Sequence, residues 1–98
     1  GQTCAAQVSD AVSTPCFAAK TFDAVLNGRF KGGWTTRHYG QPGSGVHAIQ
    51  MELAQRAYLA AEEAPWTYAP QIAAPLRAVL GRILQSLDTL ARSGALTP

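Results

Sequence analysis

Apolar side chains recur at steps of three and four residues near the carboxyl end of the chain, and this pattern constrains the fold most strongly. Polar side chains take the opposite face, at Arg77, Gln85, Asp88 and Arg92. The apolar stripe comprises Ile72, Leu76, Val79, Leu80, Ile83, Leu87 and Leu90. A period of 3.6 residues predicts an amphipathic helix over residues 72–92, with Gly94 as its cap. We expect the stripe to cover one face of a sheet.

The length and composition of the chain limit what that helix can pack against. A chain of 98 residues forms one small domain with a thin core, because small domains bury a smaller fraction of their surface. Charged residues make up 14%, fewer than an independent globular domain usually carries. Some apolar surface is therefore expected to meet another polypeptide segment. The net charge of +2 is too small to indicate a nucleic-acid or anionic-membrane partner.

Two short apolar runs predict β-strands of one sheet, which makes the expected fold class α/β. The first run, residues 22–26, ends in the turn signal Asn27-Gly28. The second run, residues 46–54, alternates in character along its length. Its apolar side chains are Ile49, Met51 and Leu53, and the other side carries Ala48, Gln50 and Glu52. A carboxylate is thereby predicted within a mostly buried strand.

The remaining segments predict a second helix and two connections. Residues 4–19 are rich in alanine and predict a helix that either breaks at Pro15, with Thr14 as a cap, or kinks there. Residues 28–45, rich in glycine and basic side chains, predict a long irregular loop of the kind that often carries function. Residues 56–70 predict an extended connection that packs its aromatic rings on the surface.

The cysteines and the first residues bear on the environment of the chain. Cys4 and Cys16 lack the spacing of a zinc finger or a redox motif, so reduced structural thiols are the simpler interpretation and a disulfide is the alternative. No apolar run is long enough to span a bilayer, and no signal peptide is recognisable, which predicts a cytoplasmic protein. The chain begins without methionine, and we expect a processed or truncated product.

Several polar residues are candidates for chemistry. Arg29 and Arg37 suit a carboxylate ligand because the guanidinium fork donates two parallel hydrogen bonds, although surface ion pairs would explain them equally well. His38 and His47 lack a second metal ligand at fixed spacing, so a structural role is open for each. Glu52 is either paired with an arginine, Arg37 or Arg56, or is a catalytic base. If the two strands are parallel, Asn27 and Glu52 share one rim of the sheet.

Two runs of sequence, residues 25–40 (VLNGRFKGGWTTRHYG) and 45–55 (GVHAIQMELAQ), closely resemble the C-terminal part of N-formylglutamate amidohydrolases. The flanking segments are similar to that family as well, so the resemblance covers nearly the whole chain. It implies that residues 1–98 are a single, incomplete C-terminal portion of such a domain. The implied fold is a fragment of a zinc-carboxypeptidase-like, phosphorylase/hydrolase-like mixed sheet with flanking helices.

The resemblance also implies an activity: zinc-dependent hydrolysis of N-formyl-L-glutamate to formate and L-glutamate, a late step of histidine breakdown. The family's zinc ligands lie upstream of the matched part, so this chain alone should neither hold a catalytic Zn²⁺ nor turn over substrate. Its partners would be the small-molecule substrate and the upstream part of the same enzyme, not a membrane. By resemblance Glu52 activates the zinc-bound water. Substrate-binding roles fall to Arg37, Arg29, Asn27, Tyr39 and His38.

A non-catalytic nucleic-acid-binding module is the competing hypothesis. It would use the basic residues of the 28–45 segment, interleaved with Phe30, Trp34 and Tyr39 as stacking platforms. The low net charge argues against it, and so does Glu52, because a carboxylate beside a phosphate groove would repel the ligand.

Overall fold

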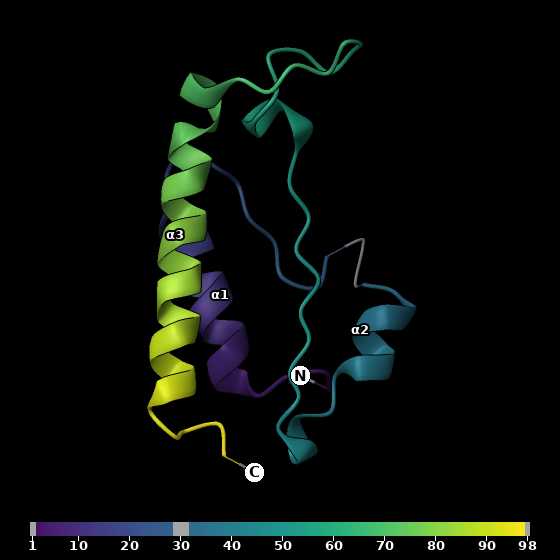
Figure 1. Ribbon diagram of the computed structural model, residues 1–98, viewed down its shortest axis with the longest axis vertical. Helices are drawn as coiled ribbons and strands as arrows, with labels where there is room; N and C mark the ends of the chain where they lie inside the picture. Colours follow the sequence, from purple (N-terminus) through teal and green to yellow (C-terminus); the bar gives the residue numbers. More distant parts are fainter. Residues whose placement is uncertain (1, 29–31, 98) are drawn as a thin grey trace.

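The computed structural model describes residues 2–28 and 32–97, and its framework is helical. Figure 1 shows two helices side by side along one flank and a third, short helix on the other side of the structure. An extended stretch of chain runs between the helical pair and the short helix. In chain order the elements are α1 (Ala6–Ala18), α2 (Trp34–Tyr39), the 3₁₀ turns Pro42–Ser44 and Gln55–Ala57, and α3 (Pro70–Arg92).

The long carboxyl-terminal helix predicted from the apolar stripe is confirmed. α3 begins two residues earlier than predicted, at Pro70, because proline fits the first helical position, where the N–H has no helical partner. It ends at Arg92, and Gly94 follows in the left-handed conformation with φ 80°, which is typical of the residue after a helix C-cap. Within the described residues no helix combines the length and the apolar character that crossing a membrane requires.

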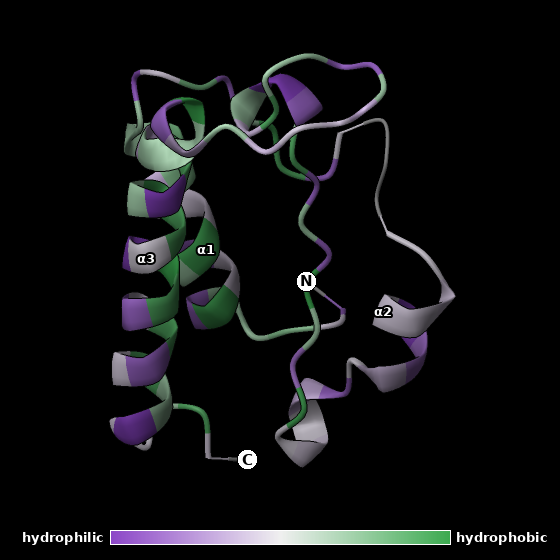
Figure 2. Cartoon of the chain, turned by 45° about the horizontal axis from the view of Figure 1, so that its top comes forward, coloured by the Kyte–Doolittle hydropathy of each residue, from purple (hydrophilic) through white to green (hydrophobic). Residues whose placement is uncertain are grey.

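The apolar stripe of α3 packs against α1, so the expectation that it covers a sheet is wrong. Figure 2 shows hydrophobic residues on the sides of α1 and α3 that face each other and hydrophilic residues on the outer side of α3. Among the described residues seven apolar side chains are buried, and all but one lie on or directly before these two helices: Cys4, Val8, Leu59, Ala73, Leu76, Val79 and Ile83. The core is thin, as the length of the chain predicts.

The amino-terminal helix is confirmed, and of the two alternatives at Pro15 the break is not realised. α1 continues through Pro15 to Ala18, and the N–H of Ala19 donates to the carbonyl of Pro15 over 3.1 Å. Pro15 lies in the last turn, so the helix loses one hydrogen bond near its end. Both cysteines are free thiols, Cys4 buried and Cys16 partly buried, so the disulfide alternative is not realised.

The mixed α/β sheet is the main correction to the expected fold. Neither predicted strand, 22–26 or 46–54, is assigned as a strand, and the described residues contain only isolated antiparallel bridges at Gln41–Val46 and Leu59–Tyr68. Alternating side chains favour an extended backbone, but a strand exists only where neighbouring backbone groups pair with it. Within residues 46–54, pairing with another segment is confined to Val46 with Gln41 and Ala48 with Thr3, and Ile49, Met51 and Leu53 are exposed.

The segment expected to be an irregular loop contains two short helical elements among its described residues. Of residues 28–45, Trp34–Tyr39 form α2 and Pro42–Ser44 form a 3₁₀ turn. Gly33 precedes α2 in an extended conformation, and Gly32 has φ 97°, a value that side chains with a Cβ rarely adopt. Glycine at position 32 therefore lets the chain turn directly into the helix.

The amino terminus connects the helical pair to the rest of the structure. The N–H of Ala48 donates to the Thr3 carbonyl, and the Thr3 hydroxyl donates to the Ala48 carbonyl, each over 2.9 Å. The N–H of Ala5 donates to Nδ1 of His47 over 3.0 Å. Gly40 is buried against Thr3, and a Cβ at position 40 would lie 2.5 Å from the Thr3 Cβ. This approach requires glycine.

The packing of α1 on α3 predicts a sharp difference between two neighbouring residues. Ile83 is 4% exposed and Leu84 is 67% exposed. Ile83→Ala should lower the free energy of unfolding of the chain by about 2–5 kcal/mol, because it leaves a cavity between the helices. Leu84→Ala, the matched control, should change it by less than about 0.5 kcal/mol. Urea titrations followed by circular dichroism measure both, and equal losses would contradict this helix packing.

Candidate active site

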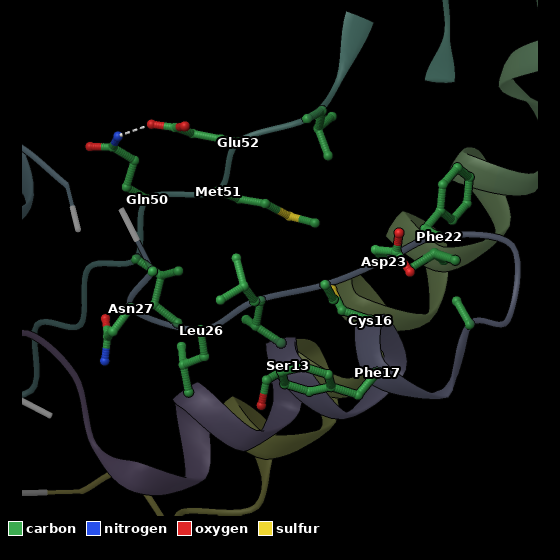
Figure 3. Close-up of a pocket in the computed structure, with 18 of the residues that line it drawn as sticks. Ser13, Cys16, Phe17, Phe22, Asp23, Leu26, Asn27, Gln50, Met51 and Glu52 are labelled. Atoms are coloured by element: carbon green, nitrogen blue, oxygen red, sulfur yellow. Dashed lines mark hydrogen bonds between the residues drawn. The ribbon is translucent and has the colours of Figure 1, made fainter. Parts of the chain in front are cut away.

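A cavity of about 660 Å³ lies between α1, residues 19–28 and residues 48–57. Figure 3 shows its two walls, which come from segments far apart in the sequence. Most of the lining is apolar, and the larger side chains are Phe17, Phe22, Val25, Leu26, Ile49, Met51 and Leu53. Its carboxylates are Asp23 and Glu52, on opposite walls. An apolar cavity with a few polar groups is the usual form of a small-molecule site.

Glu52 is fixed by its neighbour two residues earlier. Nε2 of Gln50 donates to Oε1 of Glu52 over 2.9 Å, and Oε1 of Gln50 accepts from the N–H of Gly33 over 3.0 Å. In Figure 3 the Gln50 and Glu52 side chains extend to one side of the extended segment and Met51 to the other. The alternation read from the sequence therefore places Gln50 and Glu52 together even though no strand forms.

The structure corrects two statements about Glu52. Glu52 is exposed, so its carboxylate does not lie within a buried strand. The described part of the chain holds one salt bridge, Arg92–Asp88, so Glu52 is not paired with Arg37 or Arg56. Among the described residues the second carboxylate oxygen of Glu52 has no hydrogen-bond or ion-pair partner.

Asn27 and Glu52 both line the cavity, each on its own wall, and the strand rim predicted to join them does not form. Asn27 has φ 53°, in the left-handed region that asparagine tolerates better than most residues, and this turn carries it to the end of the 19–28 wall. Arg29 lies outside the described residues. The roles of both residues stay predictions.

The other predicted site residues sit on α2, beside the cavity instead of in its lining. Thr36 is the α2 residue that lines the cavity. Nη1 of Arg37 donates to the Gly32 carbonyl over 3.4 Å, a long hydrogen bond on the exposed surface. His38 stacks on Trp34 with ring centroids 4.2 Å apart, and Tyr39 meets His38 edge-on at 4.8 Å. The structure thus gathers Arg37, His38 and Tyr39 on one helix, without joining them to Glu52 directly.

His47 has a structural position. Its Nδ1 accepts the Ala5 N–H, and its Nε2 is buried without a hydrogen-bond partner among the described residues. This geometry agrees with the structural reading of that histidine.

Zinc ligands are not assembled within residues 2–28 and 32–97. No group of three or more histidine, cysteine, aspartate or glutamate side chains is placed there to hold a metal ion. The described residues therefore do not fit a zinc ion by themselves.

Sequence reasoning gives no site role to three residues at this cavity. Gln50 lies two residues before Glu52, and this spacing in an extended segment places both side chains on one side. Asp23 lies within an apolar run, as Glu52 does. Cys16 lines the cavity, and burial raises the pKa of its thiol above the ordinary value.

Comparison with known proteins agrees with the resemblance read from the two runs. Residues 1–59 match the family model of N-formylglutamate amidohydrolase. The chain is 47% identical over 87 residues to the N-formylglutamate deformylase of Pseudomonas aeruginosa, covering 89% of this chain and 32% of that protein. It is 44% identical to the N-formylglutamate deformylase of Pseudomonas putida, with the same coverage. No solved structure matches.

The chain belongs to the N-formylglutamate amidohydrolase family, a family of hydrolases. It spans about a third of the length of the relatives it matches. Membership of this family favours the hydrolase over the nucleic-acid-binding alternative.

The raised pKa of Cys16 gives a test of the cavity wall. In a Cys4→Ala variant, where Cys16 is the single thiol, the iodoacetamide reaction should follow the thiolate. Its rate should rise with pH at a midpoint higher in the folded chain than in the same chain unfolded in urea, because burial disfavours the charged form. Coinciding midpoints would show that Cys16 is not buried beside this cavity.

Proposed function

We propose that this chain supplies part of the active site of a longer hydrolase, called the complete deformylase below, that converts N-formyl-L-glutamate to formate and L-glutamate. Its membership of the family and the printed names of the two Pseudomonas relatives support the substrate. The observation that carries the proposal is the Glu52 carboxylate, held by Gln50 on the wall of a cavity large enough for a small molecule.

We propose that the zinc ion is bound by polypeptide outside this chain. The described residues gather no set of ligands, and the relatives are about three times as long as the part matched here. The isolated chain is accordingly proposed to be inactive.

Glu52 is assigned as the general base. Its carboxylate takes a proton from the water whose oxygen attacks the formyl carbon, and a tetrahedral intermediate forms. The carbon–nitrogen bond then breaks, and Glu52 returns the proton to the departing amine nitrogen. Formate and glutamate leave, and the carboxylate is regenerated. Glu52 is suited to this because one hydrogen bond orients it while it stays exposed to the attacking water.

Arg37 is assigned to a substrate carboxylate. N-formylglutamate carries two carboxylates, and the guanidinium fork of arginine matches such a group with two parallel hydrogen bonds. The bond that Arg37 makes to the Gly32 carbonyl is long and exposed, so exchanging it for a carboxylate costs little. Asn27 offers an amide donor from the opposite wall. Arg29, His38 and Tyr39 complete the proposed substrate-binding set.

Replacing Glu52 tests the base assignment in the complete deformylase. Glu52→Gln keeps the shape of the side chain and removes its basicity, so kcat should fall by about 10²–10⁴-fold while KM and zinc content change little. Glu62→Gln, at an exposed glutamate outside the cavity lining, is the matched control and should leave kcat unchanged. Near-normal kcat in Glu52→Gln, or loss of zinc from it, would assign Glu52 another role.

Replacing Arg37 tests substrate binding by a different kinetic signature. Arg37→Ala removes charge-assisted hydrogen bonds worth about 1.5–3 kcal/mol, so KM should rise by about 10- to 100-fold with kcat little changed. Arg37→Lys should recover part of the loss, because lysine supplies the charge without the fork. Arg77→Ala, on the exposed face of α3, is the control. Steady-state kinetics with an unchanged KM in Arg37→Ala would contradict the assignment.

A further inference from the structure

The Gln50 side chain joins two parts of the proposed active site. Its amide nitrogen donates to the Glu52 carboxylate, and its amide oxygen accepts from the backbone N–H of Gly33. Gly33 is the residue that precedes α2, the helix of Arg37. One neutral side chain thereby connects the proposed base to the start of the helix that carries the proposed carboxylate-binding residue.

The backbone around Gly33 is shaped to receive this amide. Gly32 has φ 97°, and a Cβ there would stand 3.4 Å from both Oε1 of Gln50 and Oγ1 of Thr36. The Gln50 amide therefore lies close against the first turn of α2. The Gly32 carbonyl accepts from Arg37. Gln50 and Arg37 thus act on adjacent groups of the same short stretch of backbone.

Glu52 depends on this contact for its orientation. Its residue is exposed and sits in an extended segment, and Gln50 is the partner that its carboxylate has among the described residues. A long, exposed side chain without a partner samples several rotamers. A general base, in contrast, must stay within hydrogen-bond reach of the attacking water.

We infer that Gln50 is a positioning residue for the proposed reaction: it orients the Glu52 carboxylate and fixes its place relative to α2. This inference rests on the proposed function. Gln50 neither takes nor gives a proton, and it acts through Glu52. An amide suits both contacts, because it presents a donor nitrogen and an acceptor oxygen at the end of the same side chain.

The test is kinetic and uses three variants of the complete deformylase. Gln50→Glu keeps an acceptor for the Gly33 N–H and loses the donor to Glu52, and Gln50→Leu loses both contacts. Each should lower kcat by about 10-fold or more with KM, zinc content and melting temperature little changed. Gln71→Leu, at an exposed glutamine on α3, should behave as the unmodified enzyme. Normal kcat in Gln50→Glu would overturn the inference, because the bond to Glu52 would then be dispensable.

A double-mutant cycle separates this inference from the base assignment. If Gln50 acts through Glu52, adding Gln50→Leu to Glu52→Gln should lower kcat no further than Glu52→Gln alone. If the losses in kcat of the two single variants multiply in the double variant, the positioning role is wrong. If Glu52→Gln itself keeps a normal kcat, the assignment of Glu52 as general base, and with it the proposed function, is wrong. If Glu52→Gln is impaired and Gln50→Leu is not, only the positioning role fails.

Discussion

The paired hydrogen bonds between Thr3 and Ala48 hold the two halves of this structure together. The buried apolar side chains lie almost entirely on or directly before α1 and α3, and the residues 49–53 that carry Glu52 are exposed. The backbone and hydroxyl of Thr3 anchor that segment, and Ala5 adds a bond to His47. The cavity has its shape because the chain immediately before α1 is bonded to the wall opposite that helix. Gly40 allows this by leaving room for Thr3.

How far the fold could be predicted depends on the range of each interaction. The apolar period of α3 is local and strong, so the helix and its left-handed Gly94 could be read from the sequence. The sheet could not, because alternation in residues 46–54 predicts an extended backbone but not which segments will pair with it. α2 was missed because it is six residues long and begins directly after Gly32 and Gly33, which are typical of a loop.

At the candidate site, too, contacts between residues close in sequence could be predicted, and contacts between distant segments could not. The two-residue spacing of Gln50 and Glu52 fixes their contact in any extended segment, so their side chains meet without a sheet. A strand rim would bring Asn27 and Glu52 together, but the strands do not form, and the two residues line different walls of the cavity. The roles of His38 and Tyr39 rest on resemblance alone, and that of Arg37 rests on resemblance and on the geometry of its guanidinium group. No pattern in the sequence could place them on a helix beside the cavity.

The extended backbone of residues 49–53 has a consequence for how the chain behaves in solution. Its N–H groups donate to no backbone carbonyl of the described residues, and Ile49, Met51 and Leu53 stand exposed beside them. A stretch of this kind is a template for pairing with a second extended segment. Concentrated preparations of the 98-residue chain will therefore tend to self-associate and precipitate, and its handling calls for dilute solutions.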